Sequence, residues 1–141
     1  MPDDGTILHA SCVSVDGKGV LILGRSGSGK SALALALMAF GARLVSDDRT
    51  VLHTEGEAII ASAPAAVSGL IEARGLGILH ADPDPSAPVV VAVDLDRPET
   101  ERLPPHHRIS LLDREVALIH GHGITSLPSM LLQYLRGGRA A

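Results

Sequence analysis

Aromatic residues and cysteine are scarce in this sequence of 141 residues, which contains one Phe, one Tyr, no Trp and one Cys. Without aromatic side chains, the protein lacks the stacking platform on which single-stranded nucleic acid is usually bound. One cysteine cannot form an internal disulfide, which fits a reducing compartment. We therefore expect a cytoplasmic protein whose core consists of Val, Leu, Ile and Ala side chains.

An excess of positive charge and long apolar runs are missing too. Lys and Arg number 12 against 16 Asp and Glu, giving a net charge of −4, and no basic stripe is present that would bind nucleic-acid phosphates. The longest apolar run is too short to cross a bilayer. The first residues, MPDDGT, are acidic and polar, unlike a signal peptide. The sequence therefore predicts one domain over residues 1–141, with neither nucleic acid nor membrane as a partner.

Glycine, by contrast, is frequent, and three glycines stand in GRSGSGKS, residues 24–31, which fits the phosphate-binding pattern G-x-x-x-x-G-K-[ST]. The apolar run at 20–23 predicts a strand before this phosphate loop, and the run at 32–40 predicts a helix after it. A loop at a helix N-terminus favours anions. Lys30 can neutralise the outer phosphates, and the Ser31 hydroxyl can bind Mg²⁺. The predicted nucleotide-binding residues are Gly24, Arg25, Ser26, Gly27, Ser28, Gly29, Lys30 and Ser31.

Apolar runs bounded by turn signals predict mainly hairpins elsewhere. The turn signal DGKG at 16–19 joins a strand at 7–15 to the strand before the phosphate loop, and Glu55-Gly56 joins strands at 50–54 and 57–62. Because hairpins outnumber helical crossovers, the predicted fold class is α/β, a P-loop-containing mixed sheet with several hairpins and few helices, and not a doubly wound sheet. The other predicted segments are strands at 42–48, 88–96, 109–113 and 114–120, one or two helical turns at 64–70, an unassigned stretch at 71–79, a proline-rich loop at 82–88 and a helix at 127–138.

Two strand ends offer the carboxylate that a phosphate loop needs for its metal. VVVAVD ends at Asp94 and resembles a conventional Walker B strand, whereas LVSDD ends in Asp47 and Asp48. Neighbours at a strand end point in different directions, so one carboxylate of the pair can face a metal and the other an acceptor. From the residues alone both strand ends remain candidates, beside the plainer alternatives of a solvated turn and a polar strand end.

Three segments together resemble the catalytic domain of HPr kinase/phosphorylase: LHASCVSVDGKGVLILGRSGSGKSALAL, GARLVSDDRTV and IEARGLGIL. They have that family's order and spacing over residues 7–80. The resemblance implies an HPr kinase/PEP carboxykinase-like fold. It also implies the family's two reactions, phosphorylation of a serine of the phosphocarrier HPr and its reversal by inorganic phosphate with release of pyrophosphate. It favours Asp47 and Asp48 over Asp94.

The resemblance, carried over residue by residue, implies catalytic roles for Asp47, His9 and Lys30. Asp47 is the expected base toward the acceptor serine in the kinase direction, and the acid in the reverse reaction. His9 matches a family histidine near the transferred phosphate. Lys30 is the lysine of the phosphate loop.

The resemblance also implies a metal set and an acceptor side. Mg²⁺ is expected on Asp48 and Ser31, with Glu72 as a supporting acidic residue. Arg74 and the turn Gly75–Gly77 are expected to shape the acceptor side of the site.

Four histidines occur in pairs, His106-His107 and His120-x-His122. Such pairs suggest a metal site, but no cysteine or carboxylate stands at ligand spacing beside them. The sequence therefore predicts that they are loop histidines.

The chain departs from the family in three places. The family's separate N-terminal domain is expected to be absent, Ala32 stands where the family commonly has Glu, and GHGITSLPSMLLQYLRGG is shorter than the family's C-terminal segment and lacks its arginine-bearing loop. These features resemble truncated alphaproteobacterial forms, and they predict weak or absent phosphorolysis. The resemblance implies a homo-oligomer, a hexamer in the family.

The sequence therefore predicts a Mg²⁺- and ATP-dependent protein-serine kinase that acts on an HPr-like phosphocarrier of the phosphotransferase system. Two alternatives stay open. One is a P-loop NTPase or small-molecule kinase that uses Asp94 as metal ligand, and the other is a non-catalytic nucleotide-sensing module. With so few aromatic residues to stack adenine, low selectivity for ATP is expected.

Overall fold

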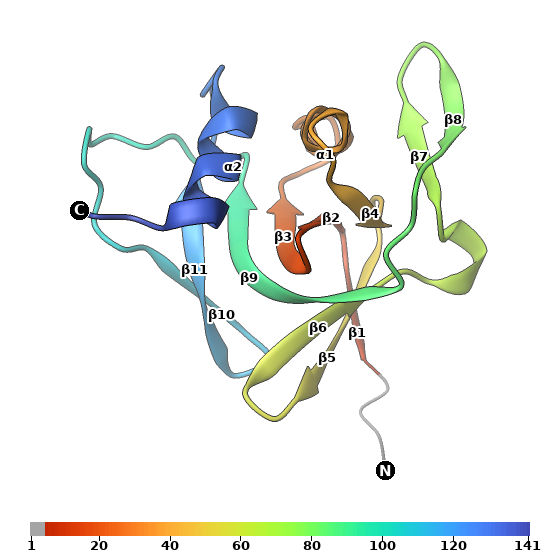
Figure 1. Ribbon diagram of the computed structural model, residues 1–141, viewed down its shortest axis with the longest axis horizontal. Coiled ribbons are helices and arrows are strands. Elements are labelled where there is room, and N and C mark those ends of the chain that lie inside the picture. The colour runs from red at the N-terminus through yellow and green to blue at the C-terminus, as the bar shows by residue number, and fades with distance from the viewer. Residues whose placement is uncertain (1–4) are drawn as a thin grey trace.

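The computed structural model describes residues 5–141, so the acidic start of the chain up to Asp4 lies outside the described residues. In the described part, strands predominate and form one branched sheet of nine strands and a separate two-stranded sheet (Figure 1). The elements are β1 (Thr6–Leu8), β2 (Ala10–Val15), β3 (Lys18–Leu23), α1 (Lys30–Ala39), β4 (Arg43–Ser46), β5 (Thr50–Glu55), β6 (Ala58–Ser62), the 3₁₀ turn η1 (Ala65–Val67), β7 (Leu70–Ala73), β8 (Gly77–His80), β9 (Ser86–Asp94), β10 (Arg108–Leu111), β11 (Arg114–His120) and α2 (Leu127–Gly137). The predicted mixed α/β class with several hairpins and few helices is confirmed.

Strand β9 organises the large sheet because its two halves pair with different neighbours. Its first half pairs antiparallel with β6, and its second half pairs parallel with both β3 and β11. The sheet curls as a result (Figure 1). Leu23 and His120 are both in register with Asp94, so three parallel strands end at one edge of the sheet.

The hairpin that leads into the phosphate loop has the predicted form. Strands β2 and β3 pair antiparallel from Ala10↔Leu23 to Val15↔Lys18. Asp16 and Gly17 at its tip have positive φ angles of 50° and 78°, which is the conformation of the turns that fit a tight hairpin. The phosphate loop therefore starts from the end of a strand that is paired on both sides.

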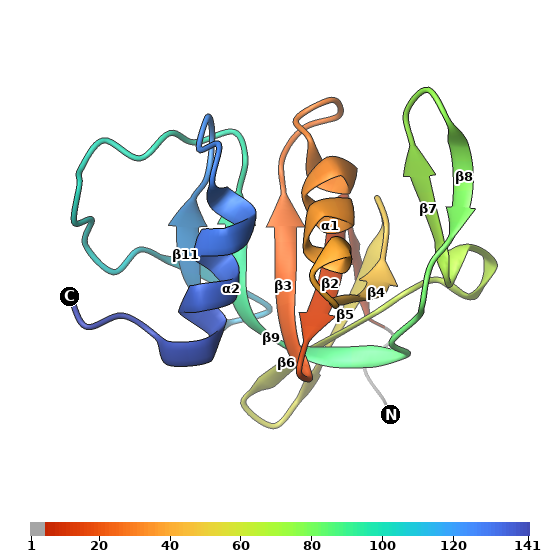
Figure 2. The same cartoon turned by 45° about the horizontal axis from the view of Figure 1, so that its top comes forward.

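Both helices cover the same face of the sheet and share one apolar core (Figures 1 and 2). Helix α1 buries Leu33, Ala34 and Leu37, and α2 buries Leu131 and Leu135 among others. This apolar contact fixes α1, and with it the C-terminal end of the phosphate loop. A second core fills the other side, where the curled sheet folds over itself. Neither described helix is both long and apolar enough to span a bilayer.

Several local predictions need correction. The predicted continuous strand at 7–15 is interrupted at His9, because β1 pairs with β5 whereas β2 pairs with β3 and β4. The stretch at 64–70 contains a single 3₁₀ turn, in agreement with the predicted one or two helical turns, and the unassigned stretch at 71–79 contributes to the β7–β8 hairpin. The proline-rich loop is shorter than predicted, since β9 already begins at Ser86.

Candidate active site

The phosphate loop connects β3 to α1 through residues that require glycine. Gly24 has a φ of 153°, and a Cβ there would lie 2.4 Å from the Ser28 Oγ and 3.0 Å from the Ser28 Cβ, so a larger residue would displace Ser28. Gly29 directly precedes α1 with a φ of 102°, in the left-handed region that L side chains rarely adopt. The loop therefore enters the helix with the backbone geometry that glycine permits.

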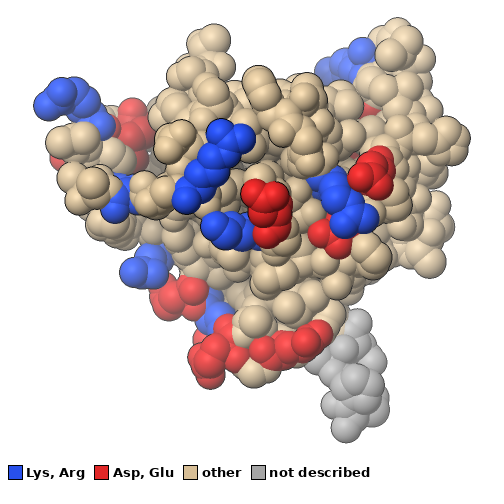
Figure 3. Space-filling view, in the orientation of Figure 1, with Lys and Arg blue, Asp and Glu red and all other residues tan. Residues whose placement is uncertain are grey.

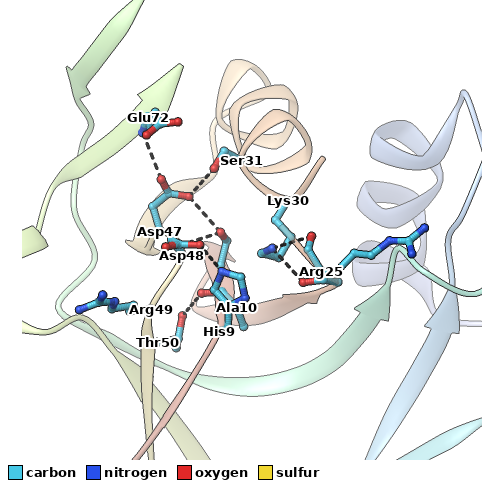
Figure 4. Close-up of polar contacts among 12 residues, drawn as sticks. His9, Ala10, Arg25, Lys30, Ser31, Asp47, Asp48, Arg49, Thr50 and Glu72 are labelled. Carbon is cyan, nitrogen blue, oxygen red and sulfur yellow. Dashed lines mark hydrogen bonds and ion pairs between the residues drawn. The ribbon is translucent and has the colours of Figure 1, made fainter. Parts of the chain in front are cut away.

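Lys30 lies folded over the phosphate loop. Its side chain is almost fully buried, and its Nζ donates to the carbonyl oxygens of Gly24, at 2.8 Å, and Arg25, at 3.1 Å (Figure 4). A buried ammonium requires such partners. The positive charge is thus fixed on the concave side of the loop, where phosphate oxygens would compete with the two carbonyl groups.

Asp47 is the buried centre of the site. Its Oδ1 accepts hydrogen bonds from the hydroxyl groups of Ser11, at 2.9 Å, and Ser31, at 2.7 Å, and its Oδ2 accepts one from the Glu72 N–H at 3.1 Å (Figure 4). These partners come from β2, α1 and β7. One carboxylate therefore joins the phosphate-loop helix to two separate parts of the sheet structure.

Asp48 points the other way. Its φ of 67° lies in the left-handed region, which Asp tolerates better than most residues. Its N–H donates to Ser11 Oγ at 3.1 Å, and its Oδ1 lies 2.6 Å from His9 Nε2. The side chains of His9 and Asp48 are 49% and 60% exposed. The structure thus gives the two aspartates different surroundings, as the sequence predicted for neighbours at a strand end.

A cavity of about 590 Å³ lies between the phosphate loop, the twin aspartates and β7. This volume is in the range of small-ligand sites. Its wall includes most of the predicted nucleotide-binding, catalytic and metal-binding residues, and Arg74 of the predicted acceptor side. They are Ser26, Gly27, Gly29, Lys30, Ser31, Asp47, Asp48, Glu72 and Arg74.

Asp94, the competing candidate, lies at the end of β9 and not in the wall of this cavity. Its Oδ1 accepts the N–H of Asp96 at 2.9 Å, and its Oδ2 lies 3.3 Å from Arg97 Nε. These contacts hold the chain as it leaves the strand. The next carboxylate, Asp96, accepts the N–H of Arg25 at 2.9 Å and so contacts the phosphate loop directly.

Ser11 belongs to the site although the sequence did not predict it. This residue is fully buried in β2 and contacts both aspartates. Its Oγ donates to Asp47 Oδ1 and accepts the N–H of Asp48. The only sequence signal is a hydroxyl residue within a mostly apolar strand, and Ser14 in the same strand has the same signal. Its neighbour Cys12 faces the core, and burial, together with the charge of Asp84, raises the pKa of its thiol to about 12.

The prediction of loop histidines is wrong for His120, which is the last residue of β11. The expectation that no carboxylate accompanies the histidines is also wrong, because in the folded chain Glu99 Oε1 lies 2.8 Å from His107 Nε2. Glu99 stands eight positions before His107 and reaches it through an irregular loop, which no short motif spacing describes.

Comparisons with known proteins agree with this architecture. The family model described as HPr Serine kinase C-terminal domain matches residues 4–83, more than half of the chain. HPr kinase/phosphorylase of Bacillus licheniformis is 47% identical over 76 residues, which are 53% of this chain and 24% of that protein. The corresponding protein of Geobacillus thermodenitrificans is 49% identical over 76 residues, 53% of this chain and 25% of that protein. The chain thus spans about a quarter of the length of these curated relatives.

A solved structure extends the similarity beyond the matched segment. The Hpr(Ser) kinase/phosphatase from Coxiella burnetii superposes with a TM-score of 0.81 at 30% identity, covering 93% of this chain and 94% of that one. The shared fold therefore includes the strands and the helix that follow residue 83. Fold, matched segment and relatives agree, and the chain belongs to the family of the HPr serine kinase C-terminal domain.

Proposed function

We propose that this chain is a Mg²⁺- and ATP-dependent protein-serine kinase that acts on an HPr-like phosphocarrier of the phosphotransferase system. The observation that supports it best is the cavity in which the phosphate loop and both aspartates meet. Phosphoryl transfer needs a nucleotide phosphate, a metal ligand and an acceptor-side base in one place. The family relatives named as HPr kinase/phosphorylase support the choice of acceptor.

The nucleotide half of the site would be formed by the phosphate loop. Its backbone N–H groups and the Lys30 ammonium would neutralise the phosphates, at the N-terminus of α1 where the helix dipole adds positive potential. Electrostatic stabilisation of this kind supplies most of the catalysis in phosphoryl transfer. The ammonium would leave the carbonyl groups of Gly24 and Arg25 for phosphate oxygens.

The metal half would be formed by Ser31 and Asp47, with Glu72 nearby. Ser31 Oγ and Asp47 Oδ1 lie 2.7 Å apart, close to the separation of about 3 Å between adjacent oxygen ligands of Mg²⁺. Oxygen donors of this kind fit the ion. Mg²⁺, when bound, would neutralise charge that develops on the transferred phosphate.

The contacts favour an exchange of the roles predicted for the two aspartates. Asp47 accepts three hydrogen bonds and is turned toward Ser31, as a metal ligand requires. Asp48 is exposed, lines the cavity and is paired with His9, so a serine of a docked protein can reach it. We therefore assign the metal to Asp47 and the acceptance of the serine proton to Asp48, oriented by His9.

The test uses the purified chain with ATP, Mg²⁺ and the HPr-like protein of the same organism, followed by intact mass measurement of the carrier. We expect addition of one phosphoryl group, and much slower addition when Lys30→Ala replaces the natural chain. Nucleotide binding without transfer to the carrier would instead identify a nucleotide-sensing module. Loss of Mg-nucleotide affinity in Asp94→Asn, with Asp47→Asn unaffected, would identify the alternative P-loop NTPase or small-molecule kinase.

Composition and surface charge bear on the kind of partner and on the cellular location that we propose. On the face in Figure 3, acidic and basic side chains are interspersed without a broad basic area, which supports a protein partner over nucleic acid. The single cysteine is buried and free, which supports a reducing, cytoplasmic location. A single domain over 1–141, and the homo-oligomer implied by the resemblance, stay predictions.

A further inference from the structure

Glu99, His107 and His120 lie together at one end of the sheet. Glu99 belongs to the loop of residues 95–107 after β9, His107 directly precedes β10, and His120 ends β11. One possible ligand atom of each lies within 4.8 Å of the other two. Glu99 Oε1 is 2.8 Å from His107 Nε2 and 3.8 Å from His120 Nδ1. A single carboxylate oxygen thus faces a nitrogen of each ring.

The backbone fixes these side chains. The second carboxylate oxygen of Glu99 accepts the N–H groups of Thr100, at 3.0 Å, and Glu101, at 3.1 Å. The carbonyl of His107 accepts the N–H of Leu118 at 2.9 Å, which sets His107 beside β11. Hydrogen bonds outside the cluster thus hold the Glu99 carboxylate and the His107 backbone, and pairing of β11 with β9 holds the His120 backbone. The site is therefore partly preorganised.

The cluster is only slightly open to solvent. The side chains of Glu99, His107 and His120 are 15%, 25% and 16% exposed. The two imidazole rings stack with centroids 4.0 Å apart and planes 17° apart, so they lie side by side and nearly parallel. Neutral imidazole is the form that binds a metal ion.

We propose that Glu99, His107 and His120 form a binding site for a divalent transition metal of the Zn²⁺ class. Two imidazole nitrogens and one carboxylate oxygen are a known ligand set of zinc sites that keep a fourth position for water. At bond lengths of about 2.1 Å, tetrahedral ligand atoms are about 3.4 Å apart. The distances of 2.8 and 3.8 Å from Glu99 Oε1 bracket this value, so small side-chain rotations admit the ion.

The site differs in place and chemistry from the proposed Mg²⁺ ligands. It lies at the β11 side of the sheet, whereas β4 and β7 lie across α1 on the other side (Figure 1). Imidazole ligands select transition metals over Mg²⁺ and Ca²⁺, which prefer oxygen. The inference therefore does not depend on the proposed kinase activity.

A bound ion would tie the loop of residues 95–107 to β11. The same loop carries Asp96, whose carboxylate accepts the N–H of Arg25 in the phosphate loop. The metal would thus stabilise the segment next to the phosphate loop.

The experiment titrates the chelator-treated full chain with Zn²⁺ by calorimetry, at millimolar Mg²⁺, and records the visible spectrum with Co²⁺ as a substitute. We expect one Zn²⁺ per chain and a rise in melting temperature with Zn²⁺. His107→Ala and His120→Ala should each weaken binding by at least about 10- to 100-fold, the effect already seen for residues that only support a ligand. His106→Ala, an exposed neighbour outside the cluster, should bind as the natural chain does.

Melting in EDTA separates binding from folding, because a variant that melts normally without metal and fails to gain stability with Zn²⁺ has lost the site alone. His9→Ala tests the exposed His9–Asp48 pair as an alternative Zn²⁺ site. Unchanged Zn²⁺ affinity in the double variant His107→Ala/His120→Ala would overturn the proposal. So would binding that disappears in His9→Ala and persists in the double variant, or absence of Zn²⁺ binding by the natural chain.

Discussion

The pairs His9–Asp48 and His107–Glu99 have similar lengths, 2.6 and 2.8 Å, but different surroundings. His9 and Asp48 are 49% and 60% exposed beside a cavity, whereas His107 and Glu99 are 25% and 15% exposed and have a second histidine against them. An exposed pair can meet a substrate that comes and goes, and a shielded pair with a third ligand suits a resident ion. Burial and neighbours, more than residue type, distinguish the two.

The largest effect is expected from the exposed pair. In the variant Asp48→Asn the side chain keeps its size, and Asn adopts the positive φ of this position as readily as Asp, but the proposed base is removed. Serine phosphorylation should fall about 10²- to 10⁴-fold while Mg-nucleotide affinity is retained, measured by carrier phosphorylation rate and nucleotide titration. Asp94→Asn is the matched control and should leave the rate nearly unchanged. Normal turnover in Asp48→Asn would mean that Asp47 accepts the serine proton, as the sequence predicted.

Lys30→Ala removes the ammonium that lies on the phosphate loop. Loss of one charge-assisted contact costs about 2–3 kcal/mol, equivalent to about 30- to 150-fold in kcat/KM for the nucleotide. The rate with limiting ATP measures it, and Lys18→Ala, whose Nζ donates to the Leu135 carbonyl far from the cavity, is the control. Unchanged kinetics in Lys30→Ala would remove the loop from the mechanism.

Asp47→Asn should act on the metal. With one ligand charge lost, the affinity for Mg-ATP should fall by about 10- to 30-fold, while nucleotide binding in EDTA changes little. Titrations at several Mg²⁺ concentrations measure the difference. If Asp48→Asn loses the Mg²⁺ dependence and Asp47→Asn keeps it, the exchange of roles proposed above is wrong.

Ser11→Ala is expected to have a smaller effect on both roles. The buried hydroxyl contacts both aspartates, so its removal should lower the free energy of unfolding by about 1–2 kcal/mol and reduce turnover several-fold. Denaturant unfolding and steady-state kinetics measure the two effects. Ser14→Ala, which removes a similarly buried hydroxyl bonded to Asp84 at 2.6 Å, should lower stability alone. Equal kinetic loss in both variants would mean that Ser11 acts only through folding.

The smallest signal is expected from the reverse reaction. Inorganic phosphate must be held in a site that already contains several carboxylates, which calls for extra cationic donors. Among the described residues, the cationic side chains in the cavity wall are Lys30 and Arg74, and Arg139 instead contacts the carbonyl groups of Pro104 and Pro105. When the chain is incubated with serine-phosphorylated carrier, millimolar phosphate and no nucleotide, a pyrophosphate assay should therefore detect little product. A rate comparable to the forward reaction would contradict this prediction.

Much of the phosphate site was predictable because its signals are local. A strand, a glycine loop and a helix occur within the segment 20–40, and the backbone conformation that glycine permits is a property of the residues themselves. The strand end at Asp47 and Asp48 was visible for the same reason. The exchange of roles that we propose for them was not visible in the sequence, because it rests on contacts of Asp47 with Ser11 and Ser31, which belong to other elements.

The sequence by itself determined the mixed α/β class, the β2–β3 hairpin before the phosphate loop and the two helices, since hydrophobic period and turn residues act over short distances. Only the tertiary structure decided where the strand at 7–15 breaks, because β1 and β2 pair with different neighbours. It also decided that Glu99 meets His107 and His120, through parallel pairing of β9 with β11 and the irregular loop between them. Pairing between strands far apart in the chain has no local sequence signal, and this pairing brings the three side chains together.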